Sequence, residues 1–225
     1  MKRLVLAALT VVCSGCHSVV SGTAAPADHL GPLPGVIAPP VKVPPLRDKL
    51  LTGEELAAIV GETSLTLGDT YLEPADDWKA VDPPGCASRI LAAQQDAYML
   101  WRTMYGTGYR GAAGRTVTEI VASFPHDYNA TYKVSQWVLT WKKCSDTVTV
   151  HNGDDVSRWT PGPITSDDTT RASTSQARQD SARVCSHVLG VSGVHTVEAT
   201  VCGEDGQTDR QAGEVTDRIL AKISR

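Results

Sequence analysis

The chain has 225 residues, of which 41% are hydrophobic and 20% are charged, as in an ordinary soluble globular protein. Its formal net charge is −4, and removal of a doubly positive N-terminus leaves the remainder near −6. A negative chain argues against nucleic-acid binding, which depends on neutralising phosphates, and against a polybasic patch that binds a membrane surface. We therefore expect no nucleic acid among its partners.

The first residues have the pattern of a secretory signal. Two positive charges precede a short apolar run, residues 4–12, which is too short to span a hydrocarbon core of about 30 Å as a helix. The string Cys-Ser-Gly-Cys follows at positions 13–16 and resembles a bacterial lipobox. We predict a lipoprotein signal peptide over residues 1–15 and lipidation of Cys16, whose acyl chains attach the protein to the cell membrane on its extracytoplasmic side. The alternative is an ordinary secretory signal cleaved nearby, which gives the same compartment.

Residues 16–48 are predicted to form an extended tether. Seven of the 13 prolines of the chain lie in this segment, among small residues. Such a composition cannot bury enough apolar surface to fold, and its prolines keep the backbone extended. The folded domain is therefore expected over residues 49–225.

The hydrophobic pattern of this domain predicts a mixture of helices and strands. In chain order we expect a helix over 50–61 that opens with a capping box at Thr52 and Glu55, a helix over 86–105, a strand over 116–124 and a helix over 129–144. Strands near 147–151 and 156–160, a loop over 165–180, a β-hairpin over 182–202 and a last helix with a capping box at Thr208 and Gln211 follow. This order indicates an α+β domain with helices packed on an antiparallel sheet.

Four cysteines remain when Cys13 leaves with the signal and Cys16 is lipidated: Cys86, Cys144, Cys185 and Cys202. Four cysteines allow three pairings. A hairpin that turns at Ser192-Gly193 makes Cys185 and Cys202 diagonal neighbours about 7 Å apart, so a small bulge would let them join. Cys86 and Cys144 are then left, each on the apolar stripe of its predicted helix. A zinc site is the competing interpretation, but no C-x-x-C spacing occurs and the compartment is oxidising.

Several segments resemble those of one known family. They are LLTGEELAAIVG (50–61), PPGCASRI (83–90), QWVLTWKKC (136–144), RVCSHVLGV (183–191), VEATVCG (197–203) and QAGEVTDRILAKI (211–223). Together they are similar to PknH-like sensor domains, the extracellular domains of mycobacterial Ser/Thr kinases, which also occur on lipoproteins. The resemblance implies an α+β fold, the disulfides Cys86–Cys144 and Cys185–Cys202, and a surface cleft that receives a ligand. It supplies no established ligand and no catalytic residues.

The motifs that resemble chemical sites have structural explanations. Gly106, Gly108 and Gly111 match G-x-G-x-x-G, but a dinucleotide site needs this motif after a strand and before a helix, and here the expected order is reversed. We interpret these glycines as a flexible connector. The paired acids at 154–155 and 167–168 are interpreted as solvated turn residues, because calcium needs more oxygen ligands at suitable spacing. We predict no catalytic residues, no cofactor and no metal site.

His187 is expected to lie opposite Glu198 in the predicted hairpin, beside a disulfide. A neighbouring carboxylate would favour the charged imidazole. The other interpretation, which we favour, is an ordinary exposed pair of side chains on neighbouring strands.

Tyr105 and Tyr109 are the candidate ligand contacts. They leave the apolar stripe of the predicted helix and lie among glycines, and tyrosine combines apolar area with a polar tip. We expect a non-enzymatic, lipid-anchored cell-envelope protein whose sensor-type domain binds a small molecule, a glycan or a lipid. The alternatives are a carrier or chaperone for an apolar envelope lipid, and an extracytoplasmic hydrolase.

Overall fold

The computed structural model of the protein describes residues 45–225, so the predicted signal peptide, Cys16 and most of the tether lie outside the described part. The helices are η1 Arg47–Lys49, α1 Gly53–Val60, η2 Trp78–Ala80, η3 Pro84–Cys86, α2 Ala87–Ile90, η4 Gln95–Ala97, α3 Asp127–Lys142 and α4 Thr208–Ile223. The strands are β1 Leu65–Tyr71, β2 Val81–Asp82, β3 Thr103–Gly111, β4 Thr116–Ser123, β5 Val148–Asn152, β6 Asp155–Ser166, β7 Arg171–Arg178, β8 Val184–Ser192 and β9 His195–Gly203.

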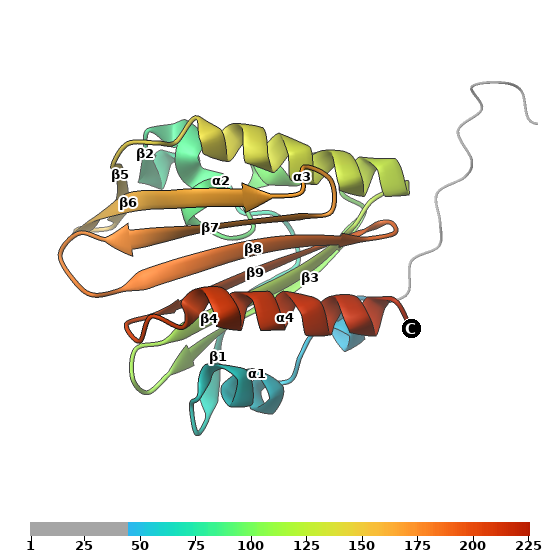
Figure 1. Ribbon diagram of the computed structural model, residues 1–225, viewed down its shortest axis with the longest axis horizontal. Coiled ribbons are helices and arrows are strands. Elements are labelled where there is room, and N and C mark those ends of the chain that lie inside the picture. The colour runs from blue at the N-terminus through green and yellow to red at the C-terminus, as the bar shows by residue number, and fades with distance from the viewer. Residues whose placement is uncertain (1–44) are drawn as a thin grey trace, which may run out of the picture. The chain divides into compact units, whose positions relative to one another are not determined.

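These strands form one antiparallel sheet in the order β1-β3-β4-β9-β8-β7-β6-β5-β2. The helices α1 and α4 cover one face of the sheet, and α3 with the short α2 covers the other (Figure 1). The predicted α+β class, with helices packed on an antiparallel sheet, is confirmed. The strand over 116–124, the helix over 129–144 and the terminal hairpin and helix are also found, with β6 longer than expected.

The strand β4 lies in the middle of the sheet and is buried on both faces. Val117 and Val121 belong to the core cluster under α1 and α4, whereas Ile120 and Ala122 belong to the cluster under α3. Alternate side chains of a strand point to opposite faces, so a strand covered on both sides needs a continuous run of apolar, β-branched residues. One carboxylic acid, Glu119, interrupts this run and is fully buried.

The capping box at the start of α1 is confirmed. The Thr52 hydroxyl accepts a hydrogen bond from the Glu55 N–H at 3.2 Å, and the Glu55 carboxylate accepts one from the Thr52 N–H at 2.7 Å. The second predicted capping box is wrong. Gln207 precedes α4 and its side chain makes no capping bond, while Thr208 bonds with Ser186 of β8 at 2.8 Å. The Thr208 side chain therefore fixes the helix to the sheet instead of capping it.

The predicted helix over 86–105 is also wrong, because only its first turn, α2, is α-helical and the short 3-10 helix η4 follows separately. The backbone has positive φ angles at Ala93 (61°) and Leu100 (71°), which an α-helix excludes. The predicted stripe positions Ala93, Ala97 and Met104 are nevertheless buried. The spacing identified core residues, but tertiary contacts override the helical conformation, and the chain returns as β3.

The predicted loop over 165–180 contains the eight-residue strand β7, which pairs with β6 and β8. Its sequence is polar because its buried positions include Thr174 and Gln176. Each satisfies a buried group: Thr174 accepts from the guanidinium of Arg89 at 2.9 Å, and Gln176 donates to the carbonyl of Ile90 at 3.3 Å. A strand with hydrogen-bonded polar residues in its core positions lacks the apolar alternation used to predict strands.

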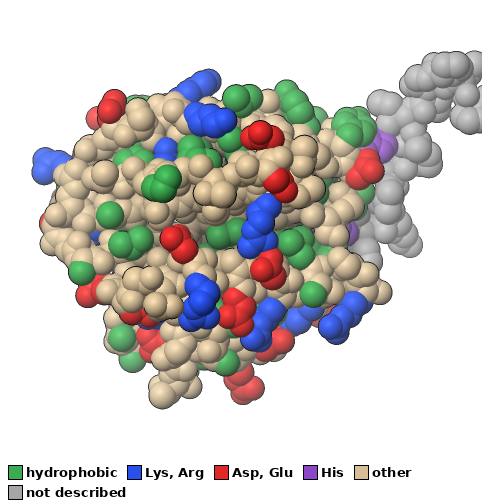
Figure 2. All heavy atoms as spheres, in the orientation of Figure 1, with side chains coloured by type: hydrophobic (Ala, Val, Ile, Leu, Met, Phe, Trp, Pro, Cys, Tyr) green, Lys and Arg blue, Asp and Glu red, His purple; other side chains and the backbone are tan. Residues whose placement is uncertain are grey.

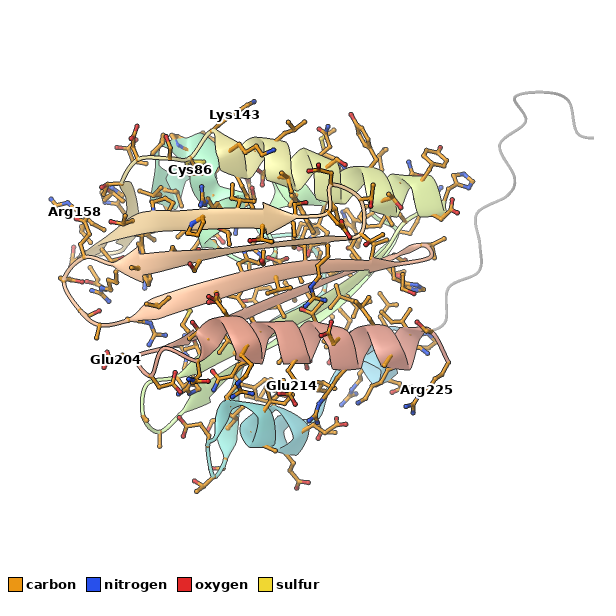
Figure 3. The ribbon with its side chains drawn as sticks, viewed as in Figure 1. Cys86, Lys143, Arg158, Glu204, Glu214 and Arg225 are labelled. Atoms are coloured by element: carbon orange, nitrogen blue, oxygen red, sulfur yellow. A yellow bond between two sulfur atoms is a disulfide. The ribbon has the colours of Figure 1, made fainter. Side chains whose placement is uncertain are left out.

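Both predicted disulfides are present, Cys86–Cys144 and Cys185–Cys202. The first joins η3 to the C-terminal end of α3; Figure 3 labels Cys86 and Lys143 at this end of the molecule. The hairpin register differs from the prediction by two residues. Ser192 pairs with His195, so Cys185 lies directly opposite Cys202 with a Cα separation of 4.0 Å. The sequence placed the turn one residue too early.

The described core begins before residue 49. Leu46 is 5% exposed and belongs, with Leu50 and Leu51, to the cluster under α1 and α4. The chain therefore packs on the sheet as soon as it leaves the proline-rich segment.

Candidate ligand-binding pocket

Tyr105 and Tyr109 lie on β3, so the interpretation of this segment as a flexible connector is wrong. Both rings are half-buried and pack against the core cluster under α1 and α4. They also line a pocket of about 470 Å³, which we call the tyrosine pocket. Its lining residues are Arg47, Asp48, Leu50, Leu51, Thr52, Gly53, Leu67, Tyr105, Thr107, Tyr109 and Lys222.

Glycines alternate with these tyrosines for a steric reason. In a strand, the side chains of Tyr105, Thr107 and Tyr109 share one face, and residues 106 and 108 point to the other. A Cβ at Gly106 would lie 2.7 Å from Cγ1 of Ile120, so only glycine lets β3 pass this core side chain. Gly53 has a related role, because a Cβ there would press on the Tyr109 ring at 3.3 Å. Gly106 thus lets β3 lie close to β4, and the glycine-rich motif belongs to a strand instead of opening a helix.

Glu119 lies below the pocket, and sequence reasoning missed it. Its carboxylate accepts hydrogen bonds from the N–H of Leu51 and from the hydroxyl of Thr107, both at 3.1 Å. Both donors belong to residues that line the pocket. Burial raises the pKa of Glu119 to about 7, although these two hydrogen bonds oppose the rise. The only sequence signal was a single acid inside the apolar run TVTEIVASF.

The rim of the tyrosine pocket connects both ends of the described chain. Lys222 of α4 donates to the carbonyl of Leu50 and to the carboxylate of Glu55, each at 2.9 Å, and Lys49 donates to the carbonyl of Lys222 at 2.9 Å. Arg47 adds a second cationic side chain to the lining. The pocket therefore combines two half-buried phenols, the cationic Arg47, the carboxylate of Asp48, the Lys222–Glu55 ion pair and a buried carboxyl beneath one wall.

On the other face of the sheet, His187 and Glu198 form a buried pair. The preferred interpretation, an exposed cross-strand pair, is wrong, since His187 is 1% and Glu198 3% exposed. The register sets His187 opposite Thr200, yet its Nε2 lies 2.7 Å from Oε1 of Glu198, a diagonal neighbour. The Glu198 carboxylate also accepts hydrogen bonds from the N–H of Ala93 and the hydroxyl of Tyr98. This cluster holds the irregular segment after α2 on the sheet.

The paired acids lie at exposed turns, as predicted, except Asp155, which is the first residue of β6. Asp154 and Asp168 are exposed, and Asp167 organises its own turn by accepting from three backbone N–H groups and the hydroxyl of Thr170. These donors hold the pKa of Asp167 well below its usual range. Within residues 45–225, no group of three or more His, Cys, Asp or Glu side chains could hold a metal ion.

The exposed face of α4 is a ladder of charges. Figure 2 shows acidic and basic side chains intermingled over this helix, where Glu214 pairs with Arg210 and Arg218. Exposed pairs of this kind contribute about 0–1 kcal/mol each. The face has no excess of one charge that would favour a particular ligand.

None of the helices described over residues 45–225 is long and apolar enough to cross a membrane.

Comparison with known families identifies the domain. The profile of the PknH-like extracellular domain matches residues 41–222, which is most of the chain. The chain belongs to this family. The family resemblance drawn from the sequence is therefore confirmed, and the match begins just before the buried Leu46.

Curated relatives of this PknH-like extracellular domain are much longer proteins. The serine/threonine-protein kinase PknH of Mycobacterium bovis is 25% identical over 198 residues, which cover 83% of this chain and 32% of the kinase. The PknH kinase of Mycobacterium tuberculosis is likewise 25% identical, with 83% of this chain and 30% of the kinase covered. The chain thus spans about a third of the length of the curated relatives it matches.

The crystal structure of the extracellular domain of PknH from Mycobacterium tuberculosis has the same fold. It superimposes with a TM-score of 0.73 at 22% sequence identity, covering 82% of this chain and 97% of that domain. The PknH-like assignment therefore rests on both sequence and architecture. The roles of Tyr105, Tyr109 and Cys16 stay predictions.

Proposed function

We propose that this protein is a lipid-anchored, extracytoplasmic member of the PknH-like family, whose domain binds a small, polar, cell-wall-derived ligand in the tyrosine pocket. The proposal treats the protein as a sensor or receptor module and not as an enzyme. Acyl chains on Cys16 would hold it at the membrane, and the proline-rich segment would separate the domain from the lipid.

The observation that carries the proposal is the composition of the tyrosine pocket. Tyr105 and Tyr109 offer ring faces and hydroxyl groups at a half-wet surface, and such groups suit ligands with both apolar and hydroxylated faces. Lys222 is paired with Glu55, so Arg47 is the cationic group of the lining that favours a ligand with a negative charge, and the carboxylate of Asp48 in the same lining limits this preference. A glycan fragment with a carboxylate has all three properties.

Hydrolysis is less well supported by the same pocket. Glu119 has a pKa of about 7, which would suit an acid or base at neutral pH. Its side chain is fully buried, however, and both partners of its carboxylate are parts of the pocket wall, Leu51 and Thr107. The carboxyl therefore does not reach a molecule in the pocket, and we assign it to support of the wall.

The test uses the soluble chain, residues 17–225, titrated with soluble peptidoglycan fragments and followed by NMR of backbone amides. We expect shifts centred on β3 and on residues 47–53, and a loss of affinity of at least tenfold in Tyr105→Ala/Tyr109→Ala. The matched control is Tyr128→Ala/Tyr132→Ala, which removes two tyrosines that are 58% and 59% exposed on α3.

Both pocket rings also touch the core, so thermal melts must accompany the titration, and Tyr109→Phe provides a variant that keeps the packing. Equal affinity in the pocket and control variants would refute the proposal. If the protein purified from its own host instead carries a bound lipid in native mass spectrometry, the carrier hypothesis replaces it.

A further inference from the structure

A second pocket lies among the irregular segments on the α2 side of the sheet, and we call it the Trp78 pocket. It has a volume of about 500 Å³. Its lining residues are Asp76, Trp78, Pro84, Gly85, Gln94, Gln95, Asp96 and Met99. None of them lines the tyrosine pocket, and the proposed function makes no use of this site.

The walls of the Trp78 pocket expose large apolar side chains to solvent. Trp78 is 45% exposed and Met99 is 63% exposed, although the chain has only five Trp and three Met in all. An aromatic ring and a flexible thioether next to each other are typical of surfaces that bind apolar groups.

The charges of this lining all have one sign. Asp76 and Asp96 are the ionisable residues of the pocket, and no Lys, Arg or His takes part in its lining. Neither carboxylate forms an ion pair within the described residues. Burial raises the pKa of Asp96, although hydrogen bonds from Ser88 and from the backbone of Ala97 oppose the rise. Lys133 interacts with this carboxylate from a distance but forms no ion pair with it, so a cation placed beside Asp96 would replace lost solvation.

Trp78 already has a cation beside it. Nζ of Lys79 lies 5.4 Å from the centre of the Trp78 ring, in cation–π geometry. Lys79 does not line the pocket, and this contact shows that the indole accepts an ammonium group.

The segments that form the pocket are held firmly. Gln94 exchanges two hydrogen bonds with Asp77, each 3.2 Å long, and a short parallel bridge joins Gln94 to Ala75. The disulfide Cys86–Cys144 ties η3, which supplies Pro84 and Gly85, to α3. Two stretches of the lining are therefore fixed by these contacts.

The third stretch is held by the buried carboxylate on this face of the sheet. Glu198 accepts hydrogen bonds from the N–H of Ala93 and the hydroxyl of Tyr98, on either side of Gln94, Gln95 and Asp96. Ala93 and Leu100 keep left-handed φ angles, which cost non-glycine residues free energy and persist where surrounding contacts fix them. The fold thus maintains a strained segment that presents Asp96 and Met99.

We propose that the Trp78 pocket binds an organic ammonium ion with an apolar body, whose hydrocarbon part contacts Trp78 and Met99 and whose charge lies near Asp76 and Asp96. The chemical class of the ligand follows from three features of the pocket: its apolar walls, an indole that accepts cations, and two carboxylates with no cation in the lining. A neutral apolar molecule would cover the two carboxylates without compensating their lost solvation, and an anion would be repelled by them.

The test uses three six-carbon probes that share a chain and differ in charge: n-hexylammonium, 1-hexanol and hexanoate. Each is titrated into the soluble chain, residues 17–225, and followed by NMR of backbone amides and of the Trp78 indole N–H. We expect n-hexylammonium to shift the signals of residues 76–78 and 94–99, and to bind at least fivefold more tightly than 1-hexanol. Hexanoate should bind least.

Two variants identify the groups responsible. Asp76→Asn/Asp96→Asn should remove the preference for n-hexylammonium over 1-hexanol while leaving 1-hexanol affinity within twofold. The matched control, Asp154→Asn/Asp155→Asn, removes the same charge from exposed positions in the turn after β5 and at the first residue of β6, and should leave the affinity for each probe unchanged.

Trp78→Leu should lower the affinity for both n-hexylammonium and 1-hexanol. The melting temperature should not change, since this ring is half-exposed. The proposal is overturned if n-hexylammonium binds no better than hexanoate, if the turn variant loses as much affinity as the pocket variant, or if the shifts map to the tyrosine pocket. The last result would implicate the site of the proposed function, whose own test uses different ligands and variants.

Discussion

Replacing Glu119 by glutamine tests whether the buried carboxyl controls the pH dependence of stability. Its pKa rises from an ordinary 4.5 to about 7 in the folded domain, chiefly because burial disfavours the charged form. One pKa unit corresponds to about 1.4 kcal/mol, so the folded state favours the protonated carboxyl by about 3 kcal/mol more than the unfolded state does.

The raised pKa of Glu119 determines the sign of its effect on stability as the pH changes. Because the folded pKa is raised, the contribution to the free energy of unfolding is fully present below about pH 4.5 and is lost as the pH rises through about 7. Proton linkage predicts that about 2.5 kcal/mol of the Glu119 contribution to the free energy of unfolding is lost between pH 5 and pH 8. For a domain of this size it corresponds to a fall in melting temperature of about 5–10 °C.

The assay is urea unfolding of the soluble chain at pH 5 and pH 8, with tryptophan fluorescence as the signal. In Glu119→Gln the amide oxygen can still accept from Leu51, but the side chain no longer titrates. We expect the difference between the two pH values to be smaller than in the unmodified protein by about 2.5 kcal/mol. Comparing the proteins cancels the contributions of other titrating groups.

Glu55→Gln is the matched control, because the same substitution should have the opposite sign. Hydrogen bonds from Thr52 and Lys222 lower the pKa of Glu55, so its contribution is present at neutral pH and is lost on acidification. Glu55→Gln should therefore destabilise the protein at pH 8. A Glu119→Gln protein with the same pH dependence as the unmodified chain would show that Glu119 is not the buried titrating group described here.

Three further predictions concern stability and processing. Leu46→Ala should lower the free energy of unfolding in urea by about 2–5 kcal/mol, as for other buried leucines. The control Pro45→Ala, at the exposed neighbouring position, should lower it by less than about 0.5 kcal/mol, and equal effects would place Leu46 outside the core. Arg89→Met removes four hydrogen bonds, three of them buried, and should lower the free energy of unfolding by at least about 3 kcal/mol; a neutral result would refute the role of these bonds. Cys16→Ala should abolish acyl labelling and accumulate precursor, and unchanged detergent partitioning would exclude lipidation.

The elements that the sequence predicted well are those with local signals. The helix α3 has an apolar stripe, the strand β4 is rich in β-branched residues, and α1 has both a capping box and a glycine with a φ of 73° at its end. The disulfide pairing was predictable because two cysteines share a hairpin. Even there, the register was set by the turn after Ser192, whose position the sequence left ambiguous by one residue.

The parts that could not be predicted depend on contacts between distant residues. β7 reads as a loop because Thr174 and Gln176 satisfy buried groups near α2, more than 80 residues away in the chain. The segment after Ile90 reads as a helix because its apolar spacing happens to fit one. Its conformation is instead decided by Glu198, about 100 residues later, which replaces the helical hydrogen bond of Ala93.

The candidate site was also only partly predictable from the sequence. Tyr105 and Tyr109 were noticed as aromatic residues that left a helical stripe, and the structure places both at one pocket, although on a strand and partly in the core. Glu119 gave only the weak signal of one acid in an apolar strand. Its importance depends on burial and on the Leu51 N–H, neither of which is visible in the sequence.

The two buried carboxylates, one on each face of the sheet, have comparable structural roles. Glu119 accepts the N–H of Leu51, and Glu198 accepts the N–H of Ala93; both donors belong to segments without regular secondary structure at that point. Buried N–H groups need a partner, and a carboxylate projecting from a strand can supply one where no neighbouring strand does. These segments carry walls of the two pockets. Each acid is costly to bury, and each fixes the position of residues that a helix or strand would otherwise have to hold.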